Sequence, residues 1–266
     1  MKKKVALFIT IVSLAIVVGT QALAGQVLDR IIASGELKVG MTKNSPPLHT
    51  MGKDGQMMGF EVDIAQAMAI SMGVKEKIVT MDFAKLLPAL ESGKIDVIIS
   101  GMTMTSERNL KVAFVGPYHI TGKTILAKHD TVFKLNQEES AANVDIKLAV
   151  LKGGTSEEIA KGAFTKAEVL VADSQDHALQ MLLDGKADAI MTDKPFCVFA
   201  AFRHKDKDLE VSNTLTFEPL GIALPEGDSL LINWVGNFLM TLDGNGLLQQ
   251  RTKFWFSNSS WMKNLP

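Results

Sequence analysis

The residues best suited to binding chemistry in this chain of 266 residues lie in one stretch, residues 95–108. The stretch begins with β-branched apolar residues, which predict a buried strand. Small and hydroxyl residues follow, and the stretch ends at Arg108. Hydroxyls and free backbone N–H groups at the end of a strand converge on one point, and an arginine adds a planar fork of donors that matches a carboxylate. We therefore predict that this stretch binds the carboxylate of a small molecule. The alternative is a surface loop whose arginine pairs with a nearby acid.

The elements that must position this stretch alternate between strands and helices. The predicted order before it is a strand at 36–41, a helix at 59–72 closed by Gly73, a strand at 76–80 and a helix at 83–90 that Asp82 caps. This order predicts a mainly parallel sheet covered by helices. Ligands bind at the carboxyl ends of the strands in such a sheet, and residues 100–108 lie at one of these ends.

The second half of the chain repeats this order. Strands are predicted at 146–151, 168–172 and 187–192, with helices after 157 and at 174–183, and the tail 228–256 is predicted as helical with a break at 243–246. Extended segments near Thr121 and Pro219 would cross between the halves, and two crossings make a hinge. The small residues 153–156 and Asp193 would then face the first stretch across a cleft.

The N-terminus predicts export. Residues 2–4 are lysines, residues 5–18 are almost wholly apolar, and Ala22-Leu23-Ala24 is a small-residue cleavage site. Together these features are typical of a secretory signal peptide, which we expect to be cleaved after Ala24. No cysteine lies near the cleavage point, so we expect an exported protein without a lipid anchor.

Composition excludes several classes of site. The formal net charge of −1 gives no electrostatic argument for nucleic-acid binding. Cys197 is the one cysteine, so neither an intrachain disulfide nor a thiolate metal cluster is possible. The five histidines lack ligand spacing. We therefore expect no metal and no cofactor.

A series of short motifs resembles the periplasmic solute-binding proteins of polar amino-acid ABC transporters, the bacterial extracellular solute-binding protein family 3. The motifs that carry the resemblance are GFEVD at 59–63, LPAL at 87–90, SGKID at 92–96, SGMT at 100–103, ER at 107–108, Phe114 with GPY at 116–118, GGT at 153–155, ADA at 187–189, TD at 192–193, DG at 243–244 and WF at 255–256. Their order and spacing hold from Leu37 to the tail. The resemblance implies the α/β type II periplasmic-binding-protein fold, with two α/β lobes joined by a two-strand hinge. The implied boundaries are a signal peptide at 1–24, a first lobe at 25–121 and 220–266, and a second lobe at 122–219.

The resemblance also implies a role for each residue of a ligand site. Arg108 would hold the α-carboxylate of an amino acid with help from Thr155, Asp193 would receive the α-ammonium, and Phe83 would pack on the ligand's side chain. The predicted ligand-binding residues are Ser45, Phe83, Ser100, Gly101, Thr103, Arg108, Gly154, Thr155 and Asp193. Such a set suits a zwitterion, which needs one fixed cation, one fixed anion and neutral donors. A helix N-cap before Pro195 is the alternative role for Asp193, and the two roles are compatible.

Departures from the family pattern bear on the side chain of the ligand. The first loop lacks an aromatic residue before Pro46-Pro47, and His119 stands where the family has a second aromatic. Lys43, Asn44 and His119 would line the side-chain end together with Ser45. This favours a polar or anionic side chain over a cationic one, unless Lys43 is simply solvated.

Three functional classes follow from the resemblance. The first is a monomeric, non-enzymatic periplasmic receptor that delivers an amino acid to the membrane permease of an ABC transporter. The second is an enzyme on the same fold, similar to cyclohexadienyl dehydratase, in which Glu218 or His119 would act as the general acid or base. The third is a sensory module. An ammonium-binding Asp193 favours the first class.

Overall fold

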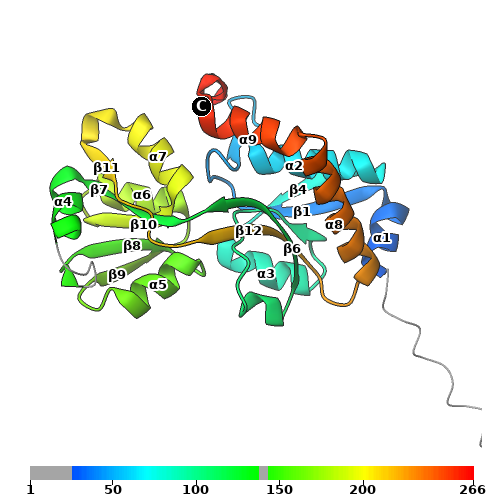
Figure 1. Ribbon diagram of the computed structural model, residues 1–266, viewed down its shortest axis with the longest axis horizontal. Helices are drawn as coiled ribbons and strands as arrows, with labels where there is room; N and C mark the ends of the chain where they lie inside the picture. The colour runs from blue at the N-terminus through cyan, green and yellow to red at the C-terminus, as the bar shows by residue number, and fades with distance from the viewer. Residues whose placement is uncertain (1–25, 138–142) are drawn as a thin grey trace, which may run out of the picture.

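The computed structural model describes residues 26–137 and 143–266. The predicted signal peptide lies outside these residues. The described chain forms two bodies that lie side by side, each built around one five-stranded sheet (Figure 1). The strands are β1 (Glu36–Met41), β2 (Thr50–Met51), β3 (Met57–Met58), β4 (Lys75–Thr80), β5 (Val97–Ile98), β6 (Ala113–Thr121), β7 (Lys123–Lys128), β8 (Lys147–Leu151), β9 (Glu168–Ala172), β10 (Ala189–Asp193), β11 (Leu209–Val211) and β12 (Glu218–Leu224). The α-helices are α1 (Gln26–Ser34), α2 (Phe60–Met72), α3 (Phe83–Glu91), α4 (His129–Gln137), α5 (Thr155–Ala163), α6 (Gln175–Leu183), α7 (Lys194–Arg203), α8 (Ser229–Gly244) and α9 (Leu247–Ser257), and short 3₁₀ helices include η1 (Arg108–Leu110) and η4 (Ser260–Asn264).

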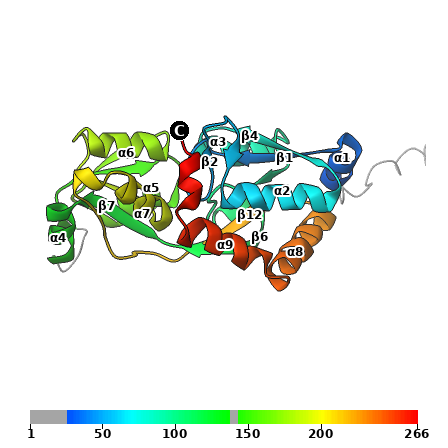
Figure 2. The same cartoon turned by 90° about the horizontal axis from the view of Figure 1, so that it is seen from above.

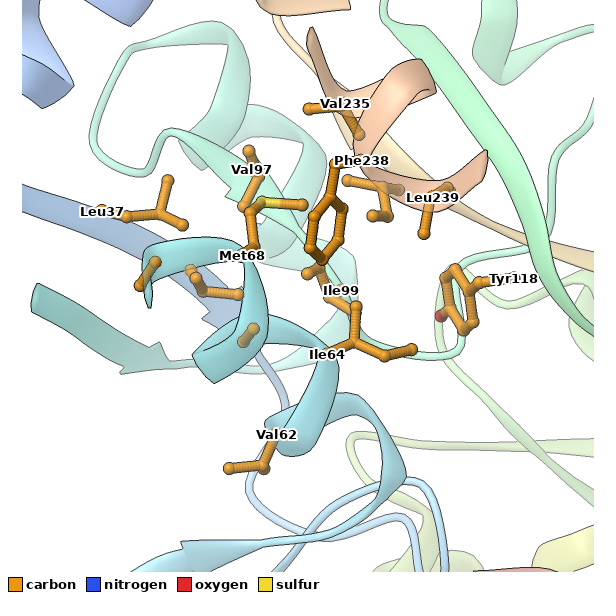
Figure 3. Packing of buried hydrophobic residues seen from close by; sticks show 14 of the residues in the cluster. Leu37, Val62, Ile64, Met68, Val97, Ile99, Tyr118, Val235, Phe238 and Leu239 are labelled. Carbon is orange, nitrogen blue, oxygen red and sulfur yellow. The ribbon is translucent and has the colours of Figure 1, made fainter. Parts of the chain in front are cut away.

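The first body is built on a sheet with the order β4-β1-β5-β12-β6, called here the β1 sheet. Its β1 pairs in parallel with β4 and β5, whereas β12 runs antiparallel to β5 and β6. Helix α2 buries Phe60, Ile64 and Met68, which lie four residues apart and therefore form one stripe. This stripe packs with α8 side chains such as Phe238 over the sheet (Figure 3). Each such side chain contributes about 1.5–3 kcal/mol on burial.

The second body is built on a sheet with the order β11-β7-β10-β8-β9, called here the β8 sheet. Its central strands β7, β10 and β8 are buried on both faces, and alternate residues belong to different clusters. Leu148 and Val150 pack with α4 and α5, whereas Ala149, which lies between them, packs with α6 and α7. This sheet therefore has helices on both faces, as the strand–helix order predicts.

The chain crosses between the two bodies at two places. Strand β6 of the β1 sheet ends at Thr121, and β7 of the β8 sheet begins at Lys123, so the first crossing is at Gly122. The second crossing lies between β11 and β12. The two crossing segments run so close that a Cβ atom on Gly122 would lie 2.3 Å from the carbonyl oxygen of Thr216. The exact lobe boundaries stay a prediction.

The C-terminal end of the chain lies beside the second body, the one built on the β8 sheet. Seen from above, η4 sits next to α7 (Figure 2), and the rings of Trp261 and Phe199 stack with centroids 5.8 Å apart. None of the described helices has both the length and the apolarity needed to cross a membrane.

Several local features differ from the sequence-based expectation. Helices α1 and α4 and the β2–β3 hairpin were not predicted. The strand expected at 95–99 pairs regularly only over Val97–Ile98. Among the described residues, the Asp82 side chain caps no backbone N–H of α3 and instead pairs with Lys85 at 2.5 Å.

Candidate functional site

A cleft of about 300 Å³ lies between the two bodies. It is lined by chain segments at the carboxyl ends of β1, β5, β8 and β10, which is where an α/β fold exposes free backbone groups. All nine predicted ligand-binding residues line it: Ser45, Phe83, Ser100, Gly101, Thr103, Arg108, Gly154, Thr155 and Asp193. The structure therefore brings the whole predicted set together, while the role of each residue stays a prediction.

Arg108 joins the two bodies across the cleft. One guanidinium nitrogen donates to the carbonyl oxygen of Thr103 at 2.9 Å, and another donates to that of Gly153, in the other body, at 3.0 Å. The guanidinium carbon lies 5.6 Å from the centroid of the Phe83 ring. Burial lowers the pKa of Arg108, but an arginine keeps its charge in proteins. The remaining donors of this fixed cation suit a bound carboxylate.

Asp193 already has a cationic partner that the sequence did not predict. Asp193 ends β10 and lies directly opposite Lys123 of β7 in an antiparallel pair, so both side chains point to the same face of the sheet. The Lys123 Nζ atom is 2.8 Å from Asp193 Oδ1. Among the described residues, the Asp193 carboxylate caps no backbone N–H of α7, so the alternative role as a side-chain N-cap is not seen.

Glu218 lies behind this pair and binds three hydroxyl groups. Thr103 and Thr155 donate to its Oε2 atom at 2.6 and 3.0 Å, and Thr216 donates to Oε1 at 2.9 Å. Thr103 and Thr155 come from different bodies, so Glu218 also connects them. Burial alone would raise the pKa of Glu218, but the Lys123 charge and these hydroxyls outweigh burial and hold the pKa below its usual value.

The lowered pKa of Glu218 predicts a pH dependence of stability. Because the pKa is lower in the folded chain than in the unfolded chain, where it is about 4.3, ionised Glu218 stabilises the fold at neutral pH. This contribution shrinks as the pH falls below about 5 and is lost once the pH has passed the folded pKa. Glu218→Gln mimics the protonated acid. We therefore expect wild type to exceed Glu218→Gln in free energy of unfolding at pH 7, with a smaller gap at pH 4, as measured by urea denaturation. An equal gap at both pH values would contradict the prediction.

A buried network under the cleft holds the loop after β5. Glu61 of α2 is fully buried, and it accepts hydrogen bonds from the backbone N–H of Gly101 at 2.6 Å and from the hydroxyl of Tyr118. Its other oxygen is 2.6 Å from Nδ1 of His49. Gly101 has a φ of +59°, which favours glycine. Burial, and then the Glu61 charge, raise the pKa of Tyr118 well above its usual value, so its hydroxyl stays a donor.

Another contact joins the two bodies at the rim of the cleft. The Asn44 amide nitrogen donates to Asp176 at 2.7 Å. Among the described residues, two buried acceptors near this contact, Oδ1 of Asn44 and Oε1 of Gln175, have no hydrogen-bond partner. Both residues line the cleft. Lys43 lines the cleft, as predicted, and it is also exposed to solvent.

The expectation that His119 lines the cleft is wrong. His119 lies on β6 and stacks on Phe256 of α9, with ring centroids 4.4 Å apart. It faces a second, larger hollow of about 570 Å³ between α7, α9 and the crossing at Gly122. Burial there lowers the pKa of His119. None of the described residues that line this hollow is an acid, and many are aromatic, so it lacks the paired charges of the cleft.

Sequence reasoning missed Lys123 and the part that Glu61 plays. Lys123 begins a segment predicted as extended, but only the strand register places it opposite Asp193. Glu61 lies in one of the motifs, yet its partners come from three separate segments. Within residues 26–137 and 143–266, no cluster of three or more metal-ligating side chains is present.

Comparison with known proteins places this geometry in a family. The model of the bacterial extracellular solute-binding proteins, family 3, matches residues 37–258. The chain belongs to this family. An L-arginine-binding protein of Pseudomonas aeruginosa is 31% identical over 90% of this chain and 95% of its own length. The cyclohexadienyl dehydratase of the same organism is 29% identical, over 86% of this chain and 85% of its own length. The ABC transporter glutamine-binding protein of Bacillus subtilis is 30% identical, over 76% of this chain and 73% of its own length.

Solved structures of family relatives confirm the predicted fold. The crystal structure of an ancestral amino acid-binding protein, described as a precursor of cyclohexadienyl dehydratase, matches with a TM-score of 0.78. It is 38% identical, and the match covers 86% of this chain and 98% of the ancestral protein. The chain thus has the type II periplasmic-binding fold.

Proposed function

We propose that this member of family 3 is an exported receptor that captures an amino acid in the cleft between its two bodies and delivers it to the membrane permease of an ABC transporter. The observation that carries the proposal is the cleft itself. It holds Arg108 on one side and the ion pair of Asp193 and Lys123 on the other, at the meeting point of both bodies. This arrangement suits the carboxylate and the ammonium of one small zwitterion.

The acceptors at the rim point to the side chain of the ligand. Oε1 of Gln175 and Oδ1 of Asn44 are buried without partners among the described residues, and Asp176 lies beside them. A buried acceptor without a donor costs free energy, which a ligand donor would recover. We infer a side chain that carries hydrogen-bond donors, such as an amide, amine or guanidinium. An amide side chain fits the polar option that the sequence suggested, whereas an amine or a guanidinium differs from the sequence-based preference against a cationic side chain.

We propose that the chain binds its ligand in the cleft without catalysing a reaction of it. The dehydratase relative makes elimination the alternative, and elimination needs a general acid or base against the substrate. Neither Glu218 nor His119 is among the described residues that line the cleft. The lowered pKa of Glu218 also leaves it without a proton to donate at neutral pH. When a hydroxycyclohexadiene loses its hydroxyl as water, together with a ring proton or a ring carboxylate released as CO2, it becomes an aromatic ring and its ultraviolet absorbance rises. We expect no such rise when the chain is mixed with a compound of this kind.

A binding screen tests this function. The purified mature chain is mixed with each of the twenty common L-amino acids, and its melting temperature is recorded, since a ligand that binds only the native state raises it. We expect the largest rise among glutamine, histidine, lysine and arginine, with smaller effects of leucine and glutamate. Isothermal titration of the best ligand gives its affinity. No rise with any amino acid would overturn the proposed function.

A further inference from the structure

Lys123 pairs with Asp193, the carboxylate that the proposed function assigns to the ammonium of the ligand. Its Nζ atom lies 2.8 Å from Oδ1 of Asp193 and 3.9 Å from Oε2 of Glu218. All three side chains are at most 7% exposed. The lysine therefore lies between two buried acids, bonded to one and close to the other.

A bound α-ammonium and Lys123 would compete for Asp193. Two ammonium groups bonded to one carboxylate lie within a few ångströms of each other, and their repulsion is weakly screened in a buried site. This repulsion favours a lysine that moves away from Asp193 when an amino acid binds there.

Glu218 is positioned to receive the displaced lysine. A shift of about 1 Å would bring Nζ to the usual distance of a charged hydrogen bond from Glu218, and the four-carbon stem of lysine permits such a shift. Glu218 itself is held in place by the hydroxyls of Thr103, Thr155 and Thr216. The second acceptor is thus fixed, and the lysine is the group that can move.

We infer that Lys123 and Glu218 tune the ammonium site: an amino acid takes Asp193, and Lys123 transfers to Glu218. This inference rests on the proposed function. The charges at this end of the cleft support it, because Asp193, Glu218 and Lys123 together leave one negative charge, and Arg108 supplies one positive charge. These groups are then matched to the α-ammonium and the α-carboxylate of one amino acid.

A charge cycle tests this inference. The tightest amino acid from the screen and its 2-hydroxy acid, which lacks the ammonium, are titrated calorimetrically into wild type, Glu218→Gln and the double variant Lys123→Met/Glu218→Gln. The readout is a ratio, namely the affinity for the amino acid divided by the affinity for the hydroxy acid. In Glu218→Gln the lysine stays bonded to Asp193 and competes with the ammonium of the ligand. The ratio should therefore fall at least about tenfold, because only the amino acid loses affinity. The double variant has the local charge of wild type, and the ratio should return to within about threefold of it.

The outcomes separate the two proposals. If the ratio does not change in Glu218→Gln, or if the double variant fails to restore it, the lysine transfer is wrong although amino-acid binding stands. If wild type binds no amino acid, the proposed function fails and this inference fails with it. Should Glu218→Gln be too unstable to titrate, Lys123→Met carries the same test. It frees Asp193, so the ratio must rise about tenfold in favour of the amino acid, and an unchanged ratio overturns the inference.

Discussion

Arg108→Met should abolish most ligand binding while the chain remains folded. The guanidinium is buried at the meeting point of both bodies, so a ligand carboxylate bound there loses a desolvated, charged partner. Truncating one partner of such a pair costs about 3–5 kcal/mol, or at least about a hundredfold in dissociation constant. Isothermal titration with the best amino acid of the screen measures this loss.

Two further variants show what kind of contact is lost. Arg108→Lys keeps the charge but loses the planar fork, so its affinity should lie between wild type and the methionine variant. Arg203→Met makes the same change at an exposed arginine of α7, away from the cleft, and should bind as wild type does. Unchanged affinity in a folded Arg108→Met chain would remove this arginine from the site.

The placement of the site followed from the sequence because strand ends and motifs are local features. Helix α2 ends at Met72, and Gly73 adopts a left-handed conformation with φ +70°, as the pattern predicted. Ser100 to Arg108 follow a buried strand, and the carboxyl-end rule then places them at the cleft. For the stretch at Arg108 the local pattern left a surface loop as the alternative, and the family resemblance supplied the rest of the predicted set.

Contacts that depend on strand register were beyond the sequence. Lys123 and Asp193 are 70 positions apart, and their pairing depends on how β7 and β10 align. His119 was placed in the cleft by likeness to a family position, but the face of β6 that it occupies packs against α9 instead. Helix α4 was missed because the residues that it buries, Val132 and Leu135, lie in a short and otherwise mostly polar segment.

Glu61→Ala should cost the fold about 3–5 kcal/mol, a large part of the stability of a typical domain. The side chain is fully buried, and its loss would leave three groups without an acceptor: the N–H of Gly101, the hydroxyl of Tyr118 and the ring of His49. Because Gly101 lies in the wall of the cleft, ligand affinity should fall as well. Urea denaturation gives the free energy of unfolding.

Glu61→Gln is the variant that tests whether the hydrogen bonds, rather than the volume, carry this stability. Its amide oxygen can accept from Gly101 and Tyr118 as the carboxylate does, and its amide nitrogen can donate to His49 if that ring carries its proton on Nε2. In that tautomer Nε2 donates to the hydroxyl of Thr42, whose oxygen lies 2.6 Å away. Glu61→Gln should therefore lose less than half of what Glu61→Ala loses. The exposed Glu226→Ala serves as the control and should stay within about 0.5 kcal/mol of wild type. If the glutamine and alanine variants lose the same stability, the loop at Gly101 is not held by this network.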